Sequence, residues 1–475
     1  MSIAEQPLPA ASKSESQAGG SLRHDSIGLL STAALTAAYM GPAISIYALF
    51  GPMFSIVGNG VGFVMMIAAV LTLLSAISFG MLAKEIPSAG GVYAWARVAL
   101  GESAGLGIGI TSAIYYAICL IFPPIVFGQF FNELLREIGF AHTNYWTFLA
   151  GGTLMLVLAA RVTYRGILVS SELALTLLLI ELAVVVGLGL TFLGIAIKHG
   201  TFSLAPITLG ACIDRWKGVM LALPLGLLCM ACDAATPASE EIKNAKWTIP
   251  VAVVLTCAMI GLWYIVGFSG FAMGTDAKDM ATLSDYISPI IPMAQRVWGP
   301  FRFLVALTAM SAAMGGFIPG ATAASRVIYS MGREGKIFRQ FGTVHPKTQT
   351  PWNALHLVYV AVLLVTIIPL WLVGADKTME WWGFVFGWFV GLVYVVANLA
   401  NIVFYWRFRR ERFHYVWNLL VPGIAIIVQV FVIWQGVIVQ LWASGTSGRS
   451  AQVFIATVTL ATGIYVWRMS QRKER

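Results

Sequence analysis

Two carboxyl groups interrupt apolar stretches of this sequence, and they are the side chains best suited to chemistry. Glu181 lies in LALTLLLIELAVVVG, with no basic residue one helical turn away, and Asp233 directly follows LPLGLLCMAC. A charge inside a membrane costs at least ~2.5 kcal/mol on insertion scales, so an acid in such a stretch is a candidate for a substrate or ion pathway.

Each of these acids allows two interpretations. Because burial favours the neutral acid, Glu181 could bind and release a proton during a transport cycle, or it could stay protonated and bonded to a backbone carbonyl group. Asp233 could accept hydrogen bonds from backbone N–H groups, or it could contact the cationic group of a substrate. Glu240 and Glu241 stand close to Lys243, which favours an ion-pair cluster at the membrane surface.

Other polar residues in the apolar stretches are weaker candidates. Tyr115, Tyr116, Ser311 and Asn398 could line a water-filled path or bond one helix to another; the two tyrosines are candidates for substrate binding. Cys229 and Cys232 form a C-x-x-C without a second pair or a nearby histidine, so they are interpreted as small apolar fillers. Nucleotide-binding and hydrolase motifs are absent, so the sequence predicts a protein without metal or cofactor that is not an enzyme.

The composition indicates a protein of the lipid bilayer. Of 475 residues, 58% are hydrophobic and 11% are charged, whereas soluble globular chains carry roughly 25% charged residues. The sequence therefore predicts an all-α polytopic membrane protein. The net charge of +9 is explained by membrane topology, without nucleic acid as a partner.

A spanning helix needs about 20 mostly apolar residues, and this rule predicts twelve spans. They lie near 27–58, 60–83, 103–132, 145–160, 167–196, 216–236, 248–273, 301–330, 353–374, 381–406, 416–441 and 451–468. Most of the 30 Lys and Arg residues fall in loops on the side of the N-terminus, which predicts that both termini are cytoplasmic. Residues 1–22 lack the layout of a signal peptide and are interpreted as a flexible cytoplasmic tail.

Two of the spans look broken. The first contains Gly41-Pro42, and the sixth contains Pro224, Gly226 and a polar break at Cys232-Asp233. The two spans are five apart and therefore run in opposite directions, which is the arrangement of an inverted repeat with two broken helices. The alternative is that each proline only kinks its helix, as membrane helices tolerate.

Three segments resemble the amino acid–polyamine–organocation permeases. They are KEIPSAGGVYAWARVALG at Lys84–Gly101, CDAATPASEEIKNAKWTIP at Cys232–Pro250 and SRVIYSMGREGKIFRQFGTVHPKTQTPWNAL at Ser325–Leu355. Their order and spacing fit the family, as do the twelve spans. The resemblance implies a LeuT-like fold in the cell membrane, with repeats at 26–196 and 214–408, two added helices at 414–468 and a cytoplasmic tail at 469–475.

The resemblance also implies where a substrate binds. In such permeases the carboxylate of an amino acid meets backbone N–H groups at the first break, and its amino group meets carbonyl oxygens at both breaks. The corresponding residues here are Gly41, Pro42, Ala43, Ile44, Ser45, Met230, Ala231, Cys232 and Asp233. Two departures stand out: Pro42 removes one N–H donor, and Glu181 falls about where some proton-coupled relatives have a lysine, so it is the candidate coupling residue.

These features predict a secondary transporter for an amino acid or similar small zwitterion, coupled to protons or working by exchange. The alternative is a carrier of polyamines or other organic cations. The third span carries no acid to bind a diamine, although Tyr115 and Tyr116 could supply an aromatic cage. A third hypothesis is a sensor that does not transport, but such proteins usually carry a sizeable soluble domain.

Overall fold

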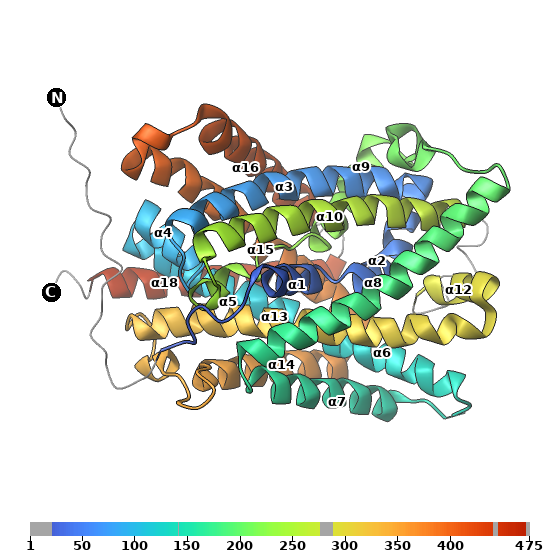
Figure 1. Cartoon of the computed structure of the whole chain (residues 1–475), viewed down its shortest axis with the longest axis horizontal. Helices are drawn as coiled ribbons and strands as arrows, with labels where there is room; N and C mark the ends of the chain where they lie inside the picture. The colour runs from blue at the N-terminus through green and yellow to red at the C-terminus, as the bar shows by residue number, and fades with distance from the viewer. Residues whose placement is uncertain (1–20, 141, 276–287, 440–444, 472–475) are drawn as a thin grey trace.

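The computed structural model describes residues 21–140, 142–275, 288–439 and 445–471, and in this part of the chain the structure is helical (Figure 1). The only pairing of β type among them is an isolated bridge between Ile27 and Ile242. The tails expected at 1–22 and 469–475 fall largely outside the described residues.

The helices follow one another along the chain as α1 (Leu29–Met40), α2 (Pro42–Val57), α3 (Val61–Glu85), α4 (Val92–Leu100), α5 (Glu102–Cys119), α6 (Phe122–Glu137), α7 (Tyr145–Thr163), α8 (Ile167–Lys198), α9 (Trp216–Leu228), η4 (Thr236–Glu241), α10 (Ala245–Met273), α12 (Ile290–Trp298), α13 (Phe303–Arg333), α14 (Trp352–Val373), α15 (Ala375–Phe408), η8 (Val416–Leu420), α16 (Val421–Val432), η9 (Ile433–Val439) and α18 (Gly445–Gln471).

Ten stretches among the described residues are long and apolar enough to cross a membrane. One of them, Leu29–Glu85, holds 57 residues, which is enough for two crossings, and α9 is too short to qualify by itself. The structure therefore agrees with an all-α polytopic protein, while the count of twelve spans and the inverted repeat stay predictions.

The first broken helix parts at Gly41, and Figure 1 shows the gap between α1 and α2 near the middle of the bundle. Gly41 has a φ of 61°, in the left-handed region that glycine adopts without a steric cost. Pro42 follows as the first residue of α2, a position where its fixed φ fits and its missing N–H is not needed by the helix. Two adjacent residues thus end one helix and start the next.

The sixth helix is broken in a different way. Pro224 lies inside α9 without ending it, and the helix stops at Leu228; helical structure resumes only with the short η4 at Thr236. The irregular backbone between them includes Cys229 to Asp233, as the sequence predicted for the polar part of this break. Such backbone is tolerated at membrane depth only where it is buried in protein or lines a cavity.

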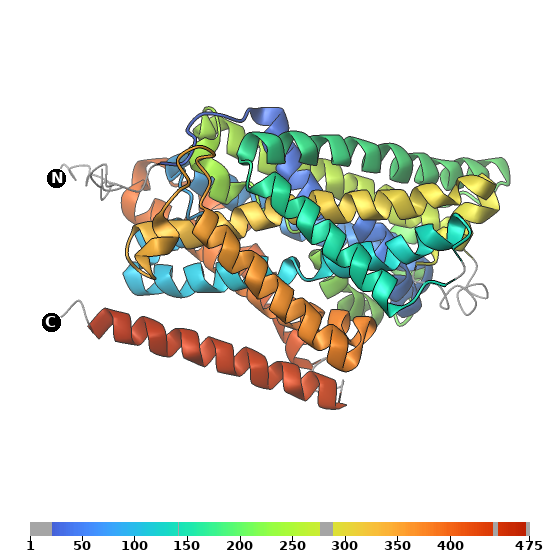
Figure 2. The same cartoon turned by 90° about the horizontal axis from the view of Figure 1, so that it is seen from below.

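Helix α1 lies inside the bundle and α18 lies outside it. Helix α1 packs against α8, α10 and α13, and α13 also contacts α5 and α6. By contrast, α18 runs along the edge of the bundle in Figure 2, and few of its residues are buried. Its end lies close to the end of α13, because the Tyr465 hydroxyl donates to the Lys336 carbonyl. Leu22, near the start of the described chain, packs against Tyr329 of α13. Both ends of the described chain therefore lie at one face of the bundle.

A substitution at the first break tests whether the left-handed conformation of Gly41 requires glycine. A Cβ atom at Gly41 would lie 2.4 Å from Cγ2 of Ile44, and an L residue in the left-handed region costs about 1–2 kcal/mol. We expect Gly41→Ala to lower the midpoint of thermal unfolding in detergent. The matched control is Gly463→Ala on α18, where a Cβ meets no atom within 4 Å. Equal midpoints for the two variants would contradict a constrained Gly41.

Candidate substrate site at the two helix breaks

The side chain of Asp233 is the centre of a cluster of tyrosine hydroxyls at the sixth break. Its Oδ1 accepts hydrogen bonds from Tyr115 at 2.7 Å and Tyr394 at 3.3 Å, and its Oδ2 accepts one from Tyr116 at 2.6 Å. Asp233 is fully buried. The sequence left two roles open for Asp233, hydrogen bonds from backbone N–H groups and contact with a cationic substrate group; its three side-chain donors are phenols from α5 and α15.

The Tyr394 hydroxyl joins the acid to the broken backbone. It accepts a hydrogen bond from the N–H of Cys232 at 3.1 Å and donates to Asp233. Asn398, one turn further along α15, bonds the Tyr394 carbonyl at 2.8 Å and the Ser75 hydroxyl of α3 at 3.0 Å. Asn398 thus bonds one helix to another, which was one of its two interpretations. Sequence reasoning did not find Tyr394. It precedes Asn398 by four residues and therefore lies on the same face of α15, which was the signal that could have found it.

Aromatic rings surround this centre and connect it to the first break. The rings of Tyr115 and Tyr116 lie 4.5 Å apart, and Phe386 lies 5.5 Å from Tyr115. Tyr39, two residues before Gly41, lies 6.0 Å from the ring of Tyr116. Its buried hydroxyl interacts with the thiol of Cys119. The end of α1 and the sixth break therefore meet at one aromatic cluster.

At the first break, side chains satisfy backbone groups that the helix no longer pairs. The Met40 carbonyl accepts from the Tyr264 hydroxyl of α10 at 2.7 Å and from the Ser45 hydroxyl at 2.9 Å. Ser45 also interacts with the thiol of Cys229, so it links the two breaks. Tyr264 was another residue that sequence reasoning missed, because nothing in its own segment marks it.

The side chain of Glu181, a residue of α8, reaches the N-terminus of α2. Its Oε1 accepts the N–H of Ala43 at 2.7 Å, while its buried Oε2 has no partner in the described part of the chain. The sequence assigned Glu181 to coupling and Ala43 to substrate binding, and the structure brings the two into direct contact. The acid accepts from an N–H group, whereas the structural interpretation had paired it with a carbonyl. A carboxyl group is well placed here because the N-terminus of a helix carries partial positive charge.

The other candidate residues contribute to the two breaks mainly through their burial. Pro42, Met230, Ala231 and Cys232 are buried and Ile44 is partly buried, so these residues form the surroundings of the breaks. The Ser311 hydroxyl donates to the Leu177 carbonyl at 3.4 Å, one turn before Glu181, and so bonds α13 to α8.

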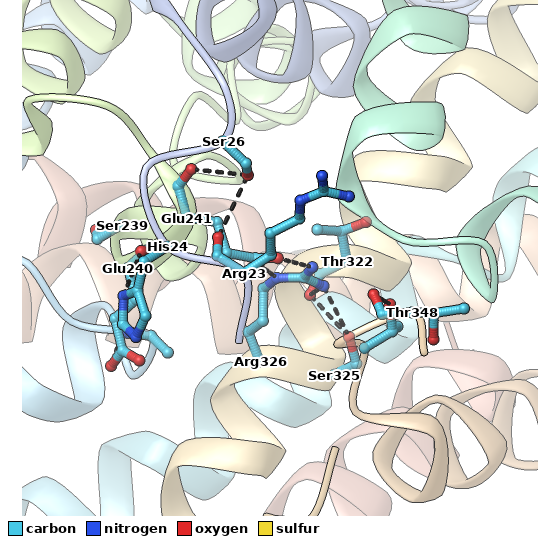
Figure 3. A network of polar contacts seen from close by, with 12 residues as sticks. Arg23, His24, Ser26, Ser239, Glu240, Glu241, Thr322, Ser325, Arg326 and Thr348 are labelled. Carbon is cyan, nitrogen blue, oxygen red and sulfur yellow. Dashed lines mark hydrogen bonds and ion pairs between the residues drawn. The ribbon is translucent and has the colours of Figure 1, made fainter. Parts of the chain in front are cut away.

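A second polar network, shown in Figure 3, lies at the face that holds both chain ends. Arg326 of α13 donates two hydrogen bonds to the Glu241 carboxylate, the one from its Nη2 at 3.1 Å, and both side chains are buried. The Glu241 carbonyl accepts the N–H of Ser26 at 2.8 Å. The network therefore ties the segment before α1 to the sixth break and to α13.

Glu240 pairs with Arg333 at 2.7 Å, and Lys243, the partner expected from the sequence, instead donates its backbone N–H to the Ile27 carbonyl. Burial opposes ionisation of Glu240, but the hydrogen bonds and charge of Arg333 outweigh it and hold the pKa of Glu240 below its usual value. The arginines of α13, far away in sequence, replace the near neighbour because the fold brings them onto η4.

Comparison with known proteins identifies the family. Residues 27–466 match the model of the amino acid permeases. The chain belongs to this permease family. Among curated proteins, the low-affinity putrescine importer PlaP of Escherichia coli K12 is 24% identical over 382 residues, which cover 78% of each chain. The branched-chain amino acid permease BcaP of Bacillus subtilis is 23% identical over 331 residues, covering 66% of this chain and 68% of that protein.

A solved structure supports the fold of this permease. The crystal structure of a manganese transporter from Eremococcus coleocola aligns with a TM-score of 0.58 and 13% identity, over 94% of this chain and 95% of that one. At this identity the likeness concerns the fold alone. Family and fold together make the protein a multi-pass membrane transporter.

The end-face network leads to a stability prediction. Arg326→Met leaves the Glu241 carboxylate buried without its cation, which typically costs ~3–5 kcal/mol. Arg333→Met, at a partly exposed pair, should cost only ~0–1 kcal/mol. Thermal unfolding in detergent should therefore show a clearly larger loss for Arg326→Met, with part of it recovered in the double variant Arg326→Met/Glu241→Gln. Equal losses for the two single variants would show that the buried pair contributes no more to stability than the partly exposed pair.

Proposed function

We propose that this permease is a secondary active transporter that carries a small amine-bearing solute, an amino acid or an organic amine, across the cell membrane by alternating access. The observation that carries the proposal is the buried Asp233 carboxylate in the sixth break, with phenol groups from two other helices around it. The proposal includes twelve spans, built as two inverted five-helix repeats and two further helices, with both termini in the cytoplasm.

The Asp233 centre has the chemistry that an ammonium group requires. A carboxylate accepts charge-assisted hydrogen bonds from it, and the faces of Tyr115, Tyr116 and Phe386 can attract a cation through their ring quadrupoles. In the proposed complex the ammonium donates to Asp233 and to the phenol oxygens, which turn their protons elsewhere. This recognition serves amino acids and polyamines alike, since both carry an ammonium group.

A specific observation favours the organic-amine alternative as well. The third span lacks an acid, which counted against a diamine, but the sixth break supplies one and the third span supplies two tyrosines that bond it. Relatives of both kinds exist in the family, a putrescine importer and a branched-chain amino acid permease.

Glu181 is the proposed coupling residue. It lies on α8 and contacts α2 across the first break, so adding or removing a proton changes the charge that faces the N-terminus of α2. Its second oxygen has no partner within the described chain and is available to a proton. The titratable groups that interact with it are the phenols of Tyr47 and Tyr264.

The substrate role of Asp233 is tested by uptake into proteoliposomes with an imposed pH gradient. A hydrogen bond to a charged group is worth about 1.5–3 kcal/mol, so Asp233→Asn should weaken apparent substrate affinity by roughly 10-fold to 150-fold. Asp214→Asn, at an exposed acid, is the matched control. Unchanged affinity in Asp233→Asn would remove Asp233 from the binding site, and absence of saturable uptake of every amino acid and amine by the unaltered protein would overturn the proposed function.

The coupling role of Glu181 gives a separate prediction. Glu181→Gln keeps an oxygen that can accept the Ala43 N–H but cannot carry a proton. We expect the variant to lose uptake driven by a pH gradient while retaining part of its exchange of internal for external substrate. Glu172→Gln, at an exposed acid of the same helix, should keep both. Gradient-driven uptake at the unaltered rate in Glu181→Gln would return Glu181 to a structural role.

A further inference from the structure

The N-terminus of α2 is the place in this site where an anion would bind, and the chain fills it with its own carboxyl group. Pro42, the first residue of α2, has no N–H, and the N–H of Gly41 is directed back to the carbonyls of Ala37 and Ala38. The N–H of Ala43 comes next, and Glu181 accepts it at 2.7 Å. An anion arriving at this helix end therefore finds the Ala43 N–H already taken by an acceptor, and the N–H of Ile44 is the next one that it could use.

Glu181 is held firmly in this position. Helix α8 runs unbroken from Ile167 to Lys198, which fixes the backbone that carries the side chain. One turn earlier, the Leu177 carbonyl is bonded by Ser311 of α13. The contact with Ala43 is independent of protonation, because a protonated carboxyl group keeps a carbonyl oxygen that accepts. The acid therefore takes the Ala43 N–H whether or not it carries a proton, and in its ionised form it also repels an anion at this helix end.

The buried charges point the same way. Among the described residues, Arg326 is the one buried basic side chain, and it is already paired with Glu241. Glu181 and Asp233 are therefore two buried carboxyl groups whose hydrogen bonds come from a backbone amide and from phenols. A zwitterion would bring a third carboxyl group to this interior, whereas a cationic amine brings only the opposite charge. Where Glu181 and Asp233 are ionised, a third carboxylate at close range is strongly unfavourable, because the dielectric constant is low.

We infer that Glu181 stands in for the substrate's carboxylate, so that this permease accepts organic amines that lack an α-carboxylate and rejects the corresponding α-amino acids. The inference rests on the proposed function, and it narrows the substrate class of the same site. The ammonium end of the amine binds at Asp233 and its phenols. At the first break, the Ala43 N–H that would anchor a substrate carboxyl group is taken by Glu181.

Paired substrates test the inference directly. Each pair contains an amine and the amino acid that yields it on decarboxylation: putrescine and ornithine, cadaverine and lysine, isoamylamine and leucine. The measurement is competition by each compound in counterflow of the best transported pair member in proteoliposomes, which needs no proton gradient. The unaltered protein should prefer the amine of at least one pair by ~10-fold or more, a conservative value for an added like charge.

The variant Glu181→Ala should reduce or reverse this preference, because it frees the Ala43 N–H for a substrate carboxylate. The matched control, Glu172→Ala on the exposed face of the same helix, should keep the preference of the unaltered protein. Since Glu181→Ala could fail to fold, the selectivity of the unaltered protein decides the matter independently.

The outcomes separate the inference from the function on which it rests. Transport of the amino acid as well as or better than its amine in every pair would overturn the inference and leave the proposed transporter standing. A preference for amines that persists in a folded Glu181→Ala protein would overturn the role assigned to Glu181. Absence of counterflow with all six compounds and with the other amino acids would overturn the proposed function and the inference together.

Discussion

The structure depends on one constraint: in the hydrocarbon of a membrane, every backbone N–H and carbonyl group must find a partner within the protein. An unbroken helix satisfies this by itself, but a broken one leaves groups to be paired by other elements. At the first break Tyr264 and Ser45 take the Met40 carbonyl, and Glu181 takes the Ala43 amide. At the sixth break Tyr394 takes the Cys232 amide. The polar side chains of the bundle interior are thus placed where the helices fail to pair themselves.

The same constraint gives the two buried acids different settings. Asp233 receives three phenol hydrogen bonds, so its carboxyl group is held in one orientation. Glu181 has one donor and one oxygen without a partner in the described chain. A fully bonded acid suits constant recognition, and a partly bonded acid suits a group whose state changes during a cycle.

What the sequence could predict follows from the range of the forces involved. The break at Gly41-Pro42 was readable because the effects of glycine and proline on the backbone are local. The contact of Glu181 with Ala43 spans 138 positions and that of Tyr394 with Asp233 spans 161, so both depend on how helices pack. The ion pair of Glu240 could not be predicted from its neighbours in the sequence. Lys243 is near in sequence, but α13 packs on η4 and brings Arg333 to Glu240 instead.

The end-face network adds a constraint on the proposed transport cycle. It bonds the segment before α1 to Glu241, and Glu241 to Arg326 of α13, while the site residues Asp233, Tyr115 and Glu181 are fully buried. In the described conformation this face is therefore held together over the proposed site. In the proposed cycle, opening it separates the segment before α1 from η4, and Gly41 is the residue at which α1 can change direction relative to α2. In that proposed movement α2 keeps its contact with Glu181, so Gly41 separates the part of the proposed site that moves from the part that stays.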